Sequence, residues 1–232
     1  MFRFKHFAIE DNLSAMKIGT DGVLLGAWAD VAGARHILDA GTGTGLIALM
    51  AAQRSANANI VAVDIVEAAA VEARSNVAMS PWSSRIEVVC HDLRTFSSDT
   101  KFDHIVSNPP FFSESLLPAD QARSVARHTT TLQFEDIVAL AERTLCEGGK
   151  LSVVLPADCG ARMRSVAFER LWLSRQTDVI TSEGDKPRRV LMEFTLRQQP
   201  LMPRCDELTI RDAQGEYTQE YRQLTEEFYL MF

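Results

Sequence analysis

The stretch LDAGTGTG, residues 38–45, decides the fold of this chain of 232 residues. It completes the apolar run RHILDA at 35–40 and leads into the helical pattern GLIALMAAQRS at 45–55, which predicts a tight turn between a buried strand and a helix. Glycine lets a backbone turn sharply and approach a ligand closely. Leu46 stands where a dinucleotide loop, G-x-G-x-x-G, has its third glycine, so NAD binding is the weaker interpretation. The three glycines of the turn are Gly41, Gly43 and Gly45.

Short β-rich runs alternate with helical patterns along most of the chain, which predicts a parallel sheet with helices on both faces. The expected strands are 35–40, 59–64, 85–90, 102–107 and 150–156, and the expected helices are 20–30, 45–55, 66–79, 132–147 and 158–170. Two further β-like runs, 170–181 and 188–197, flank the turn-rich SEGDKP and indicate an antiparallel hairpin. We therefore expect a Rossmann-like α/β fold, a mainly parallel seven-stranded sheet with a C-terminal antiparallel hairpin, which is the arrangement of class I methyltransferases.

Composition limits the location and the chemistry of the protein. The chain is 46% apolar and 24% charged, as in ordinary globular proteins. It has no apolar run of the roughly 20 residues that a membrane span needs and no signal-peptide pattern at its start. We expect a cytoplasmic protein without a membrane partner. The four cysteines form no CxxC pair, so we expect no metal site.

The net charge of −7 argues against a polyanionic partner, but the charge is unevenly spread. Residues 206–232 hold seven acidic residues against two arginines, and the rest of the chain holds 22 basic and 24 acidic residues. Three stretches are locally basic: FRFKHF at 2–7, ARSVARH at 122–128 and DKPRR at 185–189. A basic groove on an acidic protein therefore stays possible, beside the simpler interpretation of solvated surface charge.

Two acidic residues follow the next two expected strands. Asp64 lies 19 residues after Gly45, where a carboxylate can accept hydrogen bonds from both hydroxyls of an adenosine ribose. Asp92 ends EVVCHD, where it can accept from an adenine amino group. Ligands of open α/β sheets bind outside the carboxyl ends of the strands, so this order of features points to S-adenosylmethionine. The neighbours that we expect to line the same site are Asp39, Ile65, Leu93 and Asn108.

The run SNPPFF at 107–112 follows the expected strand FDHIV. A proline pair can simply end a strand, with the phenylalanines packed in the core. Together with the glycine loop and the two acidic residues, however, the run resembles the motif [ND]-P-P-[FYW] of class I amino-methyltransferases. The residues that match it are Asn108, Pro109, Pro110 and Phe111.

The resemblance implies a catalytic turn for a planar amino group. The Asn108 side-chain oxygen and the Pro109 carbonyl would accept its two N–H bonds and favour a pyramidal nitrogen aimed at the methyl group. The prolines fix φ at about −65° and restrict the residues before them, so these acceptors are held in place. Phe111 offers a face for stacking a flipped base. Positioning supplies most of such catalysis, without a metal or a covalent intermediate.

The motif does not separate adenine-N6 from glutamine-N5 chemistry, because both substrates present a planar NH2 group. Glutamine-modifying enzymes that act on release factors carry a helical domain before the sheet, for which the residues before Gly41 leave no room. The opening FRFKHFAIEDNLSAMKIGTDGVLLGAWA, 2–29, closely resembles the bacterial tRNA adenine-N6 methyltransferases that modify position 37, beside the anticodon of a valine tRNA. ARH at 126–128, KPRRVLMEF at 186–194 and YTQEYRQLTEEFYL at 217–230 resemble the same family.

This family resemblance implies roles for the opening segment and for the basic stretches. Lys17, Thr20 and Asp21 match a segment that folds over the methionine end of the cofactor, and Thr20 or Asp21 is also the expected N-cap of the helix 20–30. An anticodon-loop adenosine is unpaired, so flipping it costs less than extracting a base from a duplex. The candidate RNA contacts are Lys5, Arg123, Arg127, His128, Lys186, Arg188 and Arg189.

We expect one methyltransferase domain over 1–232, and we favour a monomer. Residues 1–33 would form a hairpin and helix that cap the cofactor, 34–199 the catalytic sheet, and 200–232 an extension packed on the body, because EEFYLMF would be costly if exposed. The alternatives are a protein glutamine-N5 methyltransferase, a catalytically silent RNA-binding module of the same fold, and a DNA adenine methyltransferase, for which no target-recognition domain is apparent.

Overall fold

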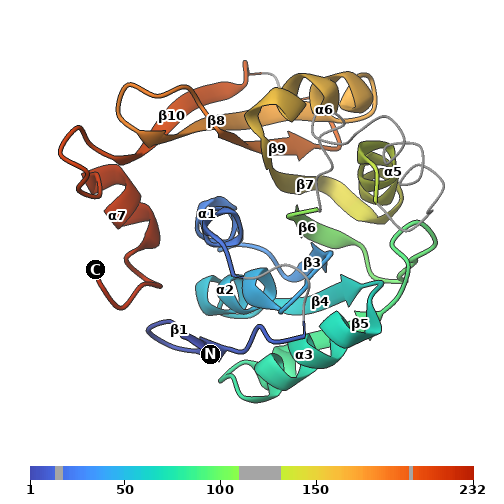
Figure 1. The fold of residues 1–232 in the computed structure, drawn as a ribbon. Helices are drawn as coiled ribbons and strands as arrows, with labels where there is room; N and C mark the ends of the chain where they lie inside the picture. The colour runs from blue at the N-terminus through green and yellow to red at the C-terminus, as the bar shows by residue number, and fades with distance from the viewer. Residues whose placement is uncertain (14–17, 110–131, 199–200) are drawn as a thin grey trace, which may run out of the picture.

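The computed structural model describes residues 1–13, 18–109, 132–198 and 201–232, and its elements are drawn in Figure 1. The strands are β1 (Phe2–Arg3), β2 (Ala8–Ile9), β3 (His36–Ala40), β4 (Asn59–Asp64), β5 (Ile86–Cys90), β6 (Phe102–Ser107), β7 (Leu145–Pro156), β8 (Trp172–Ser182), β9 (Arg189–Thr195) and β10 (Arg204–Arg211). The helices are α1 (Thr20–Trp28), α2 (Leu46–Arg54), α3 (Glu67–Ala78), α5 (Phe134–Thr144), α6 (Gly160–Ala167) and α7 (Gln219–Thr225), with 3-10 turns η1 (Ser83–Arg85) and η3 (Ala157–Cys159). No helix among these residues is long and apolar enough to cross a membrane.

The main sheet has the strand order β10-β8-β9-β7-β6-β3-β4-β5. Strands β3 to β7 pair in parallel, and β9 is antiparallel to both β7 and β8. The expected Rossmann-like class I fold, with a mainly parallel sheet and a C-terminal hairpin, is confirmed. Because β8 runs in the same direction as β6, the β8–β9 turn lies at the carboxyl edge of the sheet, where β3 and β4 also end.

The sheet has eight strands in the described part of the chain, one more than the seven expected. The eighth, β10, pairs in parallel with β8, and it lies in the segment 200–232, which the sequence analysis expected as an extension packed on the body without a strand of the sheet. Its burial is one-sided: Leu208 is only 7% exposed and packs in the core, while most of its neighbours are partly or fully exposed. A single buried position is too weak a pattern to indicate a strand.

The helix expected over 132–147 ends earlier, at Thr144. Leu145 is 3% exposed and pairs with Phe102, so the chain enters β7 directly instead of continuing the helix to the glycine pair. Gly148, with φ of 80°, lies inside β7 and does not stop the helix. Burial of Leu145 in the sheet therefore overrides the local stop signal.

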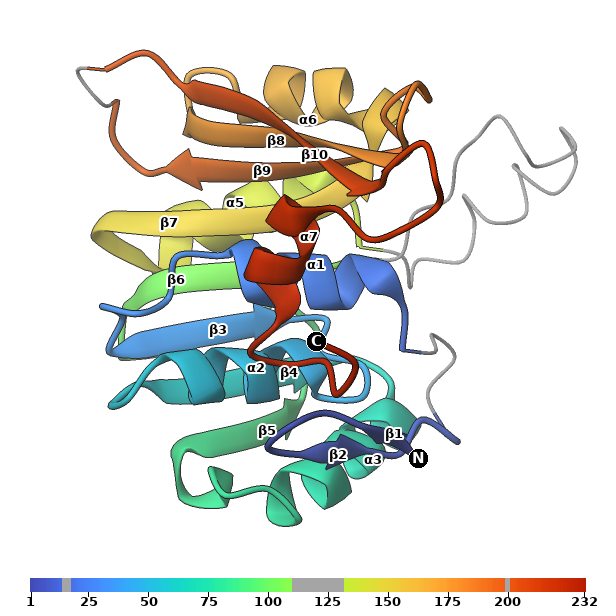
Figure 2. The same cartoon turned by 90° about the vertical axis from the view of Figure 1, so that its left-hand side faces the viewer.

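Two apolar clusters cover the two faces of the sheet, as expected for helices on both sides. One cluster joins α1 and α2 to the C-terminal Tyr221 and Phe228, and the other joins α5 and α6 to the opposite face. Figure 2 shows α7 lying across α1, with which it is in contact. The Lys5 amide also donates to the Phe228 carbonyl at 2.9 Å. The β1–β2 hairpin and the C-terminal segment are thus packed together on the body.

Candidate active site

The glycine loop has the backbone conformation that the sequence predicts. Gly41, Gly43 and Gly45 have φ values of 80°, 57° and 85°, in the left-handed region that side chains disfavour. A Cβ atom at Gly41 or Gly43 would meet no atom within 4 Å, so this backbone borders open space. The loop is therefore shaped by its dihedral angles and is open on the side where a ligand would approach.

Asp39 lies beneath this loop and is fully buried. Its Oδ2 atom accepts from the Thr42 hydroxyl at 2.6 Å and from the Ala48 amide at 3.0 Å. Its Oδ1 atom has no hydrogen-bond partner among the described residues. Burial raises the pKa of Asp39 to about 7, and the nearby charge of Asp64 adds to that rise. A bound molecule or a water can satisfy this remaining oxygen.

Asp64 ends β4 and faces the same loop. Its Oδ2 atom accepts from the Gly43 amide and its Oδ1 atom from the Val66 amide, both at 2.9 Å. The next two side chains are apolar but exposed, Ile65 by 42% and Val66 by 55%. A carboxylate beside an uncovered apolar surface suits a group with a polar sugar and a nonpolar ring.

Asp92 is engaged by a residue that the sequence interpretation did not single out. The Arg94 side chain donates to both carboxylate oxygens, with Nε at 2.9 Å from Oδ1 and Nη2 at 2.6 Å from Oδ2. This hydrogen bonding holds the pKa of Asp92 below its usual range. Leu93, between them, is 6% exposed, and its carbonyl accepts from Arg143 of α5. An adenine amino group that binds at Asp92 would therefore donate to a carboxylate that already accepts from Arg94.

The turn that carries Asn108 is tied to the glycine loop. Ser107, the last residue of β6, donates from its hydroxyl to the Ala40 carbonyl at 2.7 Å. Asn108 is half-buried and Pro109 is buried. A Cβ atom placed on Gly22 would lie 4.0 Å from the Asn108 Nδ2 atom, so this side chain abuts the first turn of α1. Pro110 and Phe111 lie outside the described residues.

Two polar residues of α3, also missed in the sequence, hold the N-terminal segment beside the glycine loop. The Asn76 side-chain oxygen accepts from the Glu10 backbone amide at 2.9 Å. Its side-chain nitrogen donates to the Glu10 carbonyl at 2.8 Å and to the Thr44 carbonyl at 2.9 Å. Glu72 accepts from the Leu13 amide at 2.7 Å. Glu72 and Asn76 are four residues apart in an alanine-rich helix, so they lie on the same face. This spacing of two polar residues was the sequence signal that could have indicated a shared contact.

The start of α1 differs from the expectation. The N-cap is Gly19, and no side chain caps this helix, so neither Thr20 nor Asp21 serves as the cap. Thr20 is exposed, and the Asp21 Oδ2 atom accepts from the Arg189 Nε atom at 2.7 Å. Lys17 lies outside the described residues.

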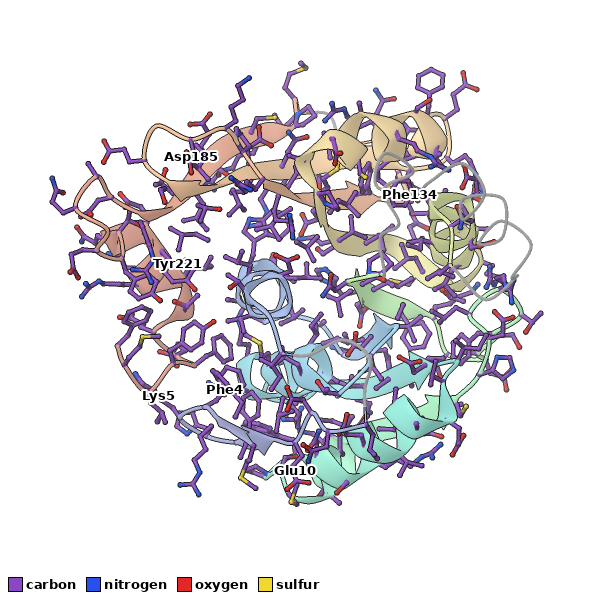
Figure 3. All side chains as sticks on the ribbon, viewed as in Figure 1. Phe4, Lys5, Glu10, Phe134, Asp185 and Tyr221 are labelled. Carbon is purple, nitrogen blue, oxygen red and sulfur yellow. The ribbon has the colours of Figure 1, made fainter. Side chains whose placement is uncertain are left out.

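The candidate RNA contacts fall into separate places. Lys186 and Arg188 are exposed in the β8–β9 turn at the carboxyl edge, and Arg189 begins β9. Figure 3 shows Asp185 of this turn well apart from Lys5, which lies on the N-terminal hairpin. The described residues therefore do not bring these two basic stretches together. Arg123, Arg127 and His128 lie outside the described residues.

Metal ligation has no counterpart in the part of the chain that the structure describes: no group of three or more histidine, cysteine or acidic side chains lies together there. The carboxyl edge instead combines an open glycine loop, two partly exposed carboxylates and an asparagine turn. This arrangement can bind a nucleoside-containing molecule and present hydrogen-bond acceptors to a second group at Asn108.

Comparisons with known proteins agree with this geometry. Residues 14–176 match the family model described as methyltransferase small domain. The chain is 49% identical over 231 residues to the tRNA1(Val) (adenine(37)-N6)-methyltransferase of Bacteroides thetaiotaomicron, covering 99% of this chain and 97% of that protein. It is 44% identical over 234 residues to the protein of the same name from Pasteurella multocida, covering 100% and 97%.

Solved structures share the fold at lower sequence identity. A predicted O-methyltransferase from Agrobacterium tumefaciens superposes with a TM-score of 0.70 at 21% identity, over 90% of this chain and 96% of that one. A ribosomal protein L11 methylase from Lactobacillus delbrueckii gives a TM-score of 0.54 at 17% identity, over 76% and 77%. At these identities the likeness establishes the fold alone.

Proposed function

Because the chain belongs to the tRNA1(Val) (adenine(37)-N6)-methyltransferase family, we propose that it methylates N6 of adenosine 37 in a valine tRNA at the turn containing Asn108. The observation that carries the assignment of the site is the hydrogen bond from Ser107 to Ala40, which places Asn108 beside the glycine loop. In this proposal, the site that binds the methyl donor and the turn that binds the substrate amine are adjacent.

The residues present fit S-adenosylmethionine. The backbone at Gly41 and Gly43 is open to a ligand, and the buried Asp39 Oδ1 atom has an unused acceptor among the described residues. The exposed apolar Ile65 gives an adenine ring a surface beside Asp64. When bound, S-adenosylmethionine would supply an electrophilic methyl group on a sulfonium centre, with the thioether S-adenosylhomocysteine as the leaving group.

Each cofactor-binding residue has a distinct part in this proposal. Asp64 accepts from the ribose hydroxyls, since each of its oxygens already accepts one backbone N–H and keeps a second lone pair. Asp92 and the adjoining Leu93 lie at the adenine end. Thr20 and Asp21, with Lys17 before them, hold the methionine end.

Asn108 and Pro109 prepare the substrate nitrogen. The lone pair of an adenine amino group is delocalised into the ring, so the group is a poor nucleophile. Acceptance of its two N–H bonds by the Asn108 side-chain oxygen and the Pro109 carbonyl favours a pyramidal nitrogen with its lone pair directed at the methyl group. Pro110 and Phe111 lie outside the described residues, and the family resemblance gives them the roles of restricting the turn and stacking on the base. After transfer, the proton carried by the methylated nitrogen leaves to water.

The RNA is held by local basic groups on an acidic protein. Lys186 and Arg188 are exposed at the carboxyl edge and are suited to phosphate contacts there. Lys5, Arg123, Arg127 and His128 complete the proposed set, whereas Arg189, also a candidate RNA contact from the sequence, pairs with Asp21. We further propose that residues 1–232 act as one domain and as a monomer, and that a tRNA substrate implies action in the cytoplasm.

Transfer of labelled methyl from S-adenosylmethionine to unmodified bulk tRNA tests this function, with protein and duplex DNA as parallel acceptors. The RNA product is digested to nucleosides, and label is expected in N6-methyladenosine. Label in protein alone would replace the proposal with glutamine-N5 methylation. An absence of label in every acceptor, despite measurable cofactor binding, would favour a module that binds RNA without catalysing.

A further inference from the structure

An ion pair links two candidate site residues that are 168 positions apart in the chain. The Arg189 Nε atom donates to the Asp21 Oδ2 atom at 2.7 Å. Asp21 lies in the first turn of α1, and Arg189 is the first residue of β9. The Arg189 side chain is 39% exposed and that of Asp21 is 29% exposed. The pair therefore joins the start of α1 to the basic β8–β9 turn at the carboxyl edge.

The first turn of α1 has little support from its own helix. Its N-cap, Gly19, provides no side-chain hydrogen bond. The Val23 amide reaches the Gly19 carbonyl at 3.5 Å, which is long for a hydrogen bond. Helix termini leave several backbone groups without intrahelical partners, so an uncapped start depends on contacts from outside the helix. Arg189 supplies an outside contact through the Asp21 carboxylate, although as a donor it does not satisfy the free backbone N–H groups.

The same turn touches the machinery of the site. A Cβ atom on Gly22 would lie 3.0 Å from the Leu46 side chain and 4.0 Å from the Asn108 Nδ2 atom. Leu46 is the first residue of α2, directly after the glycine loop. A displacement of the first turn of α1 would therefore be felt both at the glycine loop and at Asn108.

We infer that Arg189 is a positioning residue, which acts through Asp21 to hold the first turn of α1 against Leu46 and Asn108. This inference rests on the proposed function, in which Asp21 lies at the methionine end of the cofactor. Arg189 engages one oxygen of Asp21, and a carboxylate offers about four acceptor sites in all, so the same group can also receive an ammonium. Arg189 thus serves the cofactor site, whereas its neighbours Lys186 and Arg188 project from the turn as phosphate contacts.

The test compares Arg189→Ala with a matched control, Arg197→Ala, which removes another surface arginine paired with a carboxylate, Glu147. Calorimetry gives the Kd for S-adenosylmethionine without RNA, and steady-state kinetics give kcat and the KM for tRNA. We expect Arg189→Ala to raise the cofactor Kd about two- to fivefold and to lower kcat, with the tRNA KM unchanged. Arg189→Lys should recover part of the loss, and Arg197→Ala should behave as the unmodified protein.

A double-mutant cycle tests whether Arg189 acts through Asp21. In an Asp21→Ala background, Arg189→Ala should have no further effect on the cofactor Kd. Additive effects of the two changes would overturn the inference. So would an unchanged cofactor Kd with a raised tRNA KM and a weaker salt dependence, which would make Arg189 a phosphate contact. Failure of the proposed function is recognised separately, as cofactor binding by the unmodified protein without methyl transfer to tRNA.

Discussion

The Ser107 hydroxyl donates a 2.7 Å hydrogen bond to the Ala40 carbonyl, and both residues are fully buried. This contact joins the end of β6 to the end of β3, immediately before the Asn108 turn and the glycine loop. It fixes the spacing between the two parts of the site at their base, where neither part is in contact with solvent.

Ser107→Ala removes this link without adding bulk. Loss of a buried hydrogen bond is expected to lower the free energy of unfolding by about 1 kcal/mol, and kcat should fall because Asn108 is less well placed. Urea unfolding and methyl-transfer assays measure the two effects. Unchanged stability together with unchanged kcat would show that pairing between β3 and β6 positions the turn on its own.

Asn108→Ala should lower kcat by roughly 10²–10³ and leave the Kd for S-adenosylmethionine nearly unchanged, because the lost acceptor acts on the transition state. Asn108→Asp is the matched variant, since an aspartate keeps an acceptor oxygen, and it should retain more activity than the alanine variant. Single-turnover kinetics and calorimetry separate the two quantities. Near-full activity of Asn108→Ala is the result that would remove Asn108 from the mechanism.

Asp39 should make stability depend on pH. Its pKa is about 7 in the folded protein and about 3.9 in an unfolded chain. Between these values the folded state keeps a proton that the unfolded state has lost, so the free energy of unfolding falls as pH rises, by at most about 1.4 kcal/mol per pH unit. The contribution is complete below about pH 4 and lost above about pH 7.

Asp39→Asn removes this titration and can still accept from Thr42 and Ala48. The difference in unfolding free energy between the unmodified protein and the variant should therefore change steadily between about pH 4 and pH 7 and be level outside that window. Denaturant titrations across the range measure it. A constant difference would mean that Asp39 has the same pKa in the folded and unfolded protein, so that burial does not raise it.

Lys186→Ala and Arg188→Ala should each weaken tRNA binding and reduce the slope of log Kd against log salt by about 1. The Kd for S-adenosylmethionine should not change, because both side chains are exposed in the β8–β9 turn. Binding measured at several salt concentrations gives the slope. An unaltered slope for both variants would place the phosphate contacts elsewhere.

The parts of the fold that the sequence predicts are those with a repeated local pattern. The strands 59–64 and 102–107 agree with β4 and β6 at both ends, because continuous apolar runs bounded by turns indicate buried strands. β10 was not predicted because its pairing partner, β8, is distant in the sequence and because only Leu208 of β10 is deeply buried. Pairing between distant segments leaves no local pattern.

The residues of the candidate site likewise fall into those that a local sequence pattern predicts and those that it does not. Gly41, Gly43, Gly45 and Asp64 form the arrangement expected from spacing along one strand–turn–helix unit and its neighbour. Arg94 and Asn76 were missed because their importance depends on which carboxylate or backbone group lies opposite them. The N-cap expected at Thr20 or Asp21 was wrong because Asp21 instead pairs with Arg189, a partner that only the folded chain brings near.

The contacts of Asn76 carry a consequence for the order of folding. Asn76 joins Glu10, 66 residues before it, to Thr44, 32 residues before it. During translation the segment around Glu10 leaves the ribosome well before α3 exists, and domains acquire such long-range contacts late. The segment around Glu10 is therefore synthesised before α3 but fixed only after it, and a nascent chain gains this side of the site only once α3 has docked.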